Sequence, residues 1–340
     1  MENNMSRILI ETTVRQTLKG IKENPKRSIR NLVDMALHFS QGRFQSHFFQ
    51  TAHTMLEYED SAYYALIEDA VSHIETEHLV KFGMNLGYNS CTWGAQRIRA
   101  NEKQLGFNIP WTVLFEIDPV GYPDHLTQYE RIIQEGEHLG IYCWILLSHS
   151  DPLVLFPLIE AHPDSAFFLF CQPGDLTAAV LDEISALRHL MPVVQWGDHA
   201  EDACLTLRNA QLPYSVCCPY AQPEVPSILN GDLFCEIQQL HPLFTVLAAR
   251  PDCPADLREL VHQAAVQVRK GQSYQTVPWE LSCDTRSLDE IISDDACCAF
   301  FNEQGQLFAP GRAPSGNLFD AGLAPLLQRA YPKSAQIPSR

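Results

Sequence analysis

The sequence predicts an α/β fold: a partial (β/α)6 barrel of the TIM type, made of parallel strands, with an N-terminal helical extension and a small C-terminal α+β extension. Apolar runs begin 22–30 residues apart in the middle of the chain. A strand, its crossover helix and the next parallel strand need about 30 residues. The runs are almost continuously apolar, as in parallel strands covered on both faces. They are residues 81–87, 111–117, 141–147, 166–171, 192–196 and 214–218.

Size and charge limit the classes of protein. The chain has 340 residues, enough for a substantial core, and a net charge of −17. A nucleic-acid partner is not expected, because binding phosphates requires a dense basic surface. No apolar run reaches the ~18 residues of a membrane-spanning helix, and the amino terminus lacks the apolar core of a signal peptide. We therefore expect a cytoplasmic protein without a membrane or nucleic-acid partner.

The chain has eleven cysteines. In a large cytoplasmic protein they are expected to be reduced thiols. Cys143, Cys171, Cys217 and Cys218 lie inside the apolar runs, where a thiol packs as a small hydrophobic group. No two cysteines have the C-x-x-C spacing, so neither a zinc ribbon nor a thioredoxin-like site is predicted.

Residues 1–79 are expected to form the helical extension. Apolar residues recur at helical spacing, beginning with Ile8, Leu9 and Val14, and Asn24-Pro25 ends the first helix. Five histidines occur here, but no pair has the i, i+4 spacing beside a carboxylate that known metal motifs show. We expect them to be structural.

Residues 80–222 are expected to form the barrel, whose reactive groups should lie at the carboxyl ends of its strands. Cys91 follows the first apolar run, Asp118 the second and His149 the third. A carboxylate is costly to bury without a partner, and an imidazole titrates near neutral pH. Asp118 and His149 are therefore candidate catalytic residues. The alternatives are that Asp118 caps the following helix and that His149 bonds a backbone carbonyl.

The regular spacing ends after residue 222, and we expect residues 223–340 to be a separate C-terminal extension. Polar residues and a glycine interrupt alternating apolar residues near its end, which is typical of a hairpin. The expected elements are a strand within 240–254, a helix over 255–271, a hairpin that turns at 302–305, and a helix over 321–330.

The strand ends resemble those of the radical S-adenosylmethionine superfamily, whose core is a six-unit partial (β/α) barrel. In that family a Gly-Gly-Glu-Pro turn after the second strand holds the amino group of the cofactor; residues 116–119 here read Glu-Ile-Asp-Pro. The Thr-Asn-Gly-Thr turn after the third strand corresponds to Leu-Ser-His-Ser at 147–150. Residues 316–318, Gly-Asn-Leu, resemble part of the SPASM-like tail of many such enzymes. The resemblance covers roughly residues 81–220 and the tail.

The resemblance implies that S-adenosylmethionine is a possible ligand. The residues it places around the cofactor are Cys91, Glu116, Asp118, Ser148 and Ser150. Cys91 could act as a ligand or as a nucleophile. The alternative is that it is structural, as a single cysteine at the junction of a strand and a helix usually is.

The sequence departs from the family in the cluster motif. The family holds a four-iron cluster through C-x3-C-x2-C, and the corresponding residues here are Cys91, Ala95 and Ile98. One thiolate cannot replace three. A 4Fe–4S cluster is therefore not expected, and Cys91 remains as a single candidate metal ligand. The double glycine of the next turn is also absent, and the side chains of Glu116 and Ile117 would crowd a close backbone approach.

Three functions are compatible with these features, and whether the chain is an enzyme stays open. The first is a radical-SAM-like protein without a complete cluster motif, which binds a small molecule at the barrel mouth or is an accessory partner protein in a radical SAM or maturation pathway. The second is an active radical SAM enzyme with unusual iron–sulfur ligation. Its additional ligands would be thiols such as Cys171, Cys217 or Cys218.

The third function is a barrel hydrolase or lyase. A carboxylate and an imidazole at neighbouring strand ends, here Asp118 or Glu116 with His149, could carry out general acid–base catalysis. The sequence contains no nucleophile elbow, metal triad or phosphate-binding loop that would support this reading.

Overall fold

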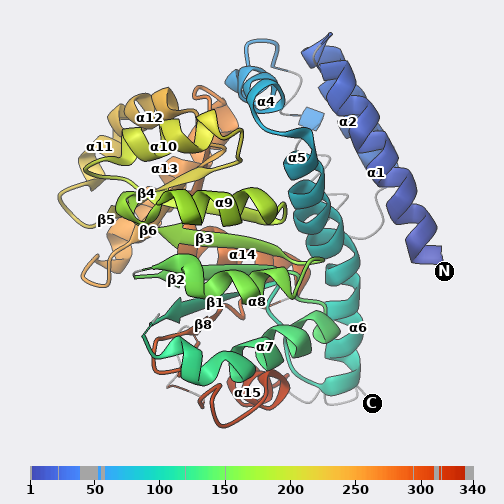
Figure 1. The fold of residues 1–340 in the computed structure, drawn as a ribbon, viewed down its shortest axis with the longest axis vertical. Coiled ribbons are helices and arrows are strands. Elements are labelled where there is room, and N and C mark those ends of the chain that lie inside the picture. Colours follow the sequence, from blue (N-terminus) through green and yellow to red (C-terminus); the bar gives the residue numbers. More distant parts are fainter. Residues whose placement is uncertain are drawn as a thin grey trace, which may run out of the picture.

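The fold is built around one curled sheet. The computed structural model describes residues 2–21, 23–38, 53–54, 58–118, 120–149, 151–293, 295–309, 314 and 316–333. These residues form nine strands in the order β7-β6-β5-β4-β3-β2-β1-β8-β9 (Figure 1). Neighbouring strands are parallel, except that β8 and β9 are antiparallel. The predicted α/β fold with a partial barrel is confirmed.

Five of the six predicted strands are present. They are β1 Thr112–Ile117, β2 Cys143–Ser148, β3 Ala166–Cys171, β4 Leu190–Gln195 and β5 Ser215–Tyr220. The strand expected within 240–254 is also present, and a further strand follows it. The remaining strands are β6 Phe244–Ala249, β7 Val277–Glu280, β8 Ala299–Phe301 and β9 Leu307–Phe308.

Helices follow most of the strands, and α7, α8, α9 and α10 lie on one face of the sheet (Figure 1). Gly140 ends α7 in the left-handed conformation, with φ 112°. The helices that connect the strands from β1 to β7 are α7 Tyr122–Leu139, α8 Phe156–Glu160, α9 Ala178–Ala186, α10 Ala200–Asn209, α11 Val225–Leu229, α12 Asp232–Ile237 and α13 Ala255–Gly271. Short 3₁₀ turns occur at η2 Pro152–Leu155, η3 Pro173–Asp175 and η4 Gln238–Leu240.

The main core lies between the sheet and these helices. Phe115 of β1 and Trp144 of β2 are fully buried, and the rings of Phe115 and Tyr129 of α7 lie 5.5 Å apart. Successive side chains of a strand point to opposite faces. The opposite face carries a second cluster around Val193 and Cys217, so both faces of the sheet are apolar.

The first predicted strand, 81–87, is wrong, because this segment is helical. Val80 and Met84 are both buried and lie one turn apart, and Asn85 donates hydrogen bonds to the carbonyls of Pro163 and Ser165 at 2.9 and 2.7 Å. A short apolar run does not by itself distinguish a strand from a buried helix. The helices here are α5 Thr76–Gly83, the π-helical segment η1 Met84–Gly94, and α6 Ala95–Leu105. Strand β8 occupies the position beside β1 instead.

The N-terminal part is helical where the structure describes it. Arg15 of the first helix forms an ion pair with Glu77 of α5, and α5 continues across the predicted boundary at residue 79. The helices are α1 Glu2–Ile21, α2 Pro25–His38 and α4 Ala62–His73. Much of the segment between α2 and α4 lies outside the described residues. The domain boundaries remain a prediction. Within the described chain, the helices are too short or too polar to cross a membrane.

Helix α14 Leu281–Ile292 joins distant parts of the sheet. It follows β7 directly, and near its other end Asp289 Oδ1 accepts a hydrogen bond at 2.8 Å from the backbone N–H of Trp111, the residue before β1. This helix was not predicted. The expected helix over 255–271, the hairpin of β8 and β9, and the closing helix are all present, the last as α15 Leu323–Ala330.

Candidate functional site

A histidine and two glutamates meet at the carboxyl end of the sheet. Ile117 of β1 pairs with Ser148 of β2, so Glu116 and His149 lie at the same edge. His149 Nε2 lies 2.9 Å from Glu116 Oε1 and 3.7 Å from Glu303 Oε1. The structure therefore brings together two predicted site residues, and adds a third from the turn between β8 and β9.

This group is accessible to solvent. The exposed fraction is 55% for the side chain of His149, 30% for Glu116 and 37% for Glu303. Because carboxylates only accept hydrogen bonds, His149 Nε2 donates to Glu116. Two carboxylates beside one imidazole suit a ligand that carries positive charge. Their ligand atoms lie within 4.8 Å of one another, so the group could also hold a metal ion.

The Gly-Asn-Leu segment of the tail positions Glu303. Asn317 Nδ2 donates to the carbonyl of Gln304 at 2.6 Å. Gly305 has φ 72°, and a β-carbon there would lie 2.8 Å from Asn317 Oδ1, so this turn requires glycine. Sequence reasoning predicted the hairpin and this segment. It missed Glu303, because no local pattern indicates that β8 pairs with β1.

Asp118 has a different environment. Its carboxylate accepts hydrogen bonds from the backbone N–H groups of Val120 at 3.0 Å and Gly121 at 3.1 Å. It thus stabilises the turn that leads into α7, but it does not cap the helix as the alternative proposed, because the N-cap residue is Gly121 and has no side-chain cap. Ser148 is buried at the end of β2, and the predicted site residue Ser150 lies outside the described residues.

Cys91 lies within η1 and not after a strand. Burial raises the pKa of its thiol to about 12. Without a bound cation the thiol is therefore protonated at neutral pH, and a protonated thiol is a poor nucleophile. Ala95 and Ile98, at the other two positions of the family's cluster motif, are both buried in the core.

The strand cysteines are buried, whereas Cys91 is partly buried. Burial raises the pKa of the thiols of Cys171, Cys217 and Cys218. Within the described part of the chain, two groups of three side chains could hold a metal ion, and neither includes these cysteines or Cys91. One is the group at the strand ends; the other lies on α13 and α14. The described residues thus bring no three of these sulfurs together.

Comparison with known proteins identifies distant similarity in structure only. No family model and no curated protein matches the sequence. The chain is similar to three crystal structures of SuiB from Streptococcus suis: one bound to S-adenosylmethionine, one described without a ligand, and one bound to the precursor peptide SuiA. Their TM-scores are 0.49, 0.48 and 0.47, with 10, 9 and 10% identity.

These alignments cover 69, 86 and 69% of this chain and 67, 77 and 68% of the SuiB chains, in the same order. At such identities and TM-scores, the similarities assign no activity to this chain.

Proposed function

We propose that this chain is a radical-SAM-like binding protein without a 4Fe–4S cluster, which takes a positively charged small molecule at the barrel mouth and acts as an accessory partner protein. The observation that carries the proposal is the convergence of Glu116 and Glu303 on His149. The sequence resemblance assigns the turn that begins at Glu116 to the amino group of S-adenosylmethionine.

The chemistry of the group favours such a ligand. An ammonium group has donors only, and a carboxylate has acceptors only, so their hydrogen bonds are charge-assisted. S-adenosylmethionine also carries a positive sulfonium. Because Glu116 and Glu303 are partly exposed, salt should weaken the attraction but not abolish it.

The accessory role rests on the positions that would hold the cluster. Cys91 is the one cysteine at these three positions, and the buried side chain of Ile98 fills space in the core. Radical chemistry of this family depends on a cluster with three protein sulfurs. A chain that keeps the barrel and lacks those sulfurs is suited to binding a ligand or a partner protein.

Isothermal titration and thermal unfolding with S-adenosylmethionine test the proposal. We expect binding without added iron, and a melting temperature that rises with ligand concentration, because ligand that binds only the folded state stabilises it. S-adenosylhomocysteine, which lacks the sulfonium charge, should bind more weakly. Glu116→Gln should weaken binding about tenfold, consistent with the loss of one charge-assisted hydrogen bond.

The matched control is Glu201→Gln, which changes an exposed glutamate on α10. It should bind S-adenosylmethionine as the unmodified chain does. Absence of binding, or equal binding by Glu116→Gln and the unmodified chain, would contradict the proposed site.

A second candidate is a hydrolase or lyase, favoured by the 2.9 Å contact between His149 Nε2 and Glu116 Oε1. A carboxylate that orients an imidazole is a common general acid–base arrangement. A panel of p-nitrophenyl esters tests the hydrolase form of this candidate. Turnover that is lost in His149→Ala would support it, and equal rates in both proteins would exclude His149 as the catalytic base for these esters.

A further inference from the structure

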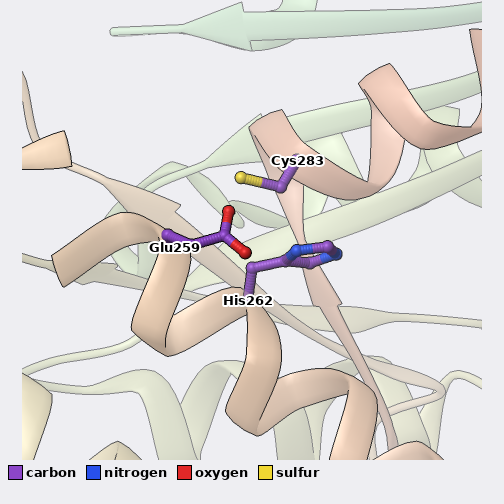
Figure 2. A group of neighbouring side chains, drawn as sticks. All are labelled: Glu259, His262 and Cys283. Carbon is purple, nitrogen blue, oxygen red and sulfur yellow. The ribbon is translucent and has the colours of Figure 1, made fainter. Parts of the chain in front are cut away.

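Three potential metal ligands on two helices lie close together. They are separate from the group that Glu116, His149 and Glu303 form at the strand ends. Glu259 and His262 lie one turn apart on α13, and Cys283 lies in the first turn of α14, directly after β7. Figure 2 shows the carboxylate and the sulfur pointing toward each other, with the imidazole beside them. One ligand atom from each residue lies within 4.8 Å of the other two.

This spacing is close to that of a mononuclear metal site. A tetrahedral zinc ion binds at about 2.0–2.3 Å, which places its ligand atoms about 3.5 Å apart. Side-chain rotations that shorten the separations to this distance would complete the site. Glu259 is exposed, and His262 and Cys283 are partly buried. Water can therefore reach the group and occupy a fourth position.

A network behind His262 fixes its ring. His262 Nε2 lies 3.1 Å from Asp284 Oδ1. Arg269 donates to both oxygens of Asp284, each at 2.6 Å, and the side chain of Asp284 is only 9% exposed. Because this carboxylate accepts hydrogen bonds, Nε2 donates to it and the lone pair is on Nδ1. In Figure 2, Nδ1 is the ring nitrogen nearer to Glu259 and Cys283.

This arrangement is the one that metal-bound histidines adopt. Their second ring nitrogen usually donates to a carboxylate or a carbonyl, which fixes both the tautomer and the ring orientation. Here the carboxylate is itself held in place by Arg269. The imidazole is therefore oriented for a ligand before any ligand binds.

The charges around the sulfur also favour a cation. The carboxylates of Glu280 and Glu259 lie near this sulfur. They attract a cation, and a thiol that coordinates a metal loses its proton to solvent.

We propose that Glu259, His262 and Cys283 form a mononuclear site for a divalent transition metal of the zinc class, with water as the fourth ligand. A sulfur, an imidazole nitrogen and a carboxylate oxygen are the donors that zinc accepts. The site is independent of the ligand proposed for the barrel mouth.

Cobalt binding to the full-length chain, after treatment with a chelator, tests the site under anaerobic conditions. We expect one Co²⁺ per chain, a thiolate-to-cobalt charge-transfer band in the near ultraviolet, and loss of this band when Zn²⁺ is added. Cys283→Ser should abolish the band. Cys235→Ser, which changes an exposed cysteine on α12, is the matched control and should keep it.

Two further variants distinguish a metal ligand from a residue that orients a ligand. Glu259→Gln changes an exposed residue, so it should fold normally and bind Zn²⁺ at least tenfold more weakly. Asp284→Asn should weaken binding 10–100-fold, as is usual for a residue that orients a metal-bound histidine. Failure to bind Co²⁺ at one per chain, or a charge-transfer band that survives Cys283→Ser, would overturn the proposal. Unchanged Zn²⁺ affinity in Glu259→Gln would overturn the role of that residue as a ligand.

Discussion

Asp289 of α14 provides a pH-dependent test of how the fold is held together. Its side chain is fully buried, and this burial raises the pKa of its carboxyl group to about 8. Oδ1 accepts a hydrogen bond from the backbone N–H of Trp111 at 2.8 Å. We predict that Asp289→Asn, which keeps an oxygen acceptor for this bond, stabilises the folded protein by an amount that increases with pH.

The magnitude follows from the two pKa values. An aspartate in an unfolded chain ionises near pH ~4, whereas Asp289 in the folded protein keeps its proton up to about pH 8. Between these values the folded state binds more protons than the unfolded state. The free energy of unfolding therefore falls as pH rises, by about 1.4 kcal/mol per unit. From pH 5 to pH 7 the loss is about 3 kcal/mol, a large share of the stability of an ordinary domain.

Urea unfolding at pH 5, 6 and 7, followed by tryptophan fluorescence, measures this effect. The difference in unfolding free energy between Asp289→Asn and the unmodified chain should grow by about 1.4 kcal/mol per unit. Asp182→Asn, which changes an exposed residue of α9, is the control, and its difference should stay constant. A difference for Asp289→Asn that does not change with pH would refute the reasoning.

Three further predictions concern the scaffold. Gly136→Ala should lower the free energy of unfolding by about 1–3 kcal/mol, measured in thermal melts, because a β-carbon there would lie 2.4 Å from the buried ring of Trp144 in β2. The control is Gly174→Ala, where a β-carbon has free space, and it should change the stability little. Asn85→Ala should cost about 2 kcal/mol in urea unfolding, since the buried carbonyl of Ser165 and the partly buried carbonyl of Pro163 lose their donor; an unchanged midpoint would contradict this. Iodoacetamide should label exposed Cys235 much faster than Cys91, whose pKa is raised to about 12 by burial, and fast labelling of Cys91 at pH 7 would argue against a protonated thiol.

Much of the sheet was predictable from local pattern. Continuous apolar runs such as 111–117 and 166–171 became strands, because a parallel strand is covered on both faces. The prediction of a strand at 81–87 was wrong because the apolar residues of this run also fit one face of a helix, and the helix gains the hydrogen bonds of Asn85. Strand β7 was missed because it has only four residues and contains Pro278, which is typical of a sheet edge.

The candidate sites were predictable only where consecutive strands of the predicted barrel bring the residues together. Glu116 and His149 follow from the rule that parallel strands end at the same edge. Glu303 depends on the pairing of β8 with β1, which lies far away in the sequence. The Glu-x-x-His spacing of Glu259 and His262 was visible, but their meeting with Cys283 depends on how α13 packs against α14.

Anaerobic reconstitution with iron and sulfide, followed by iron analysis and visible spectroscopy, tests the central claim most directly. We predict iron far below the about four atoms per chain that a 4Fe–4S cluster requires, with no cluster absorption. A stoichiometric four-iron cluster that is lost in Cys91→Ala would contradict the account.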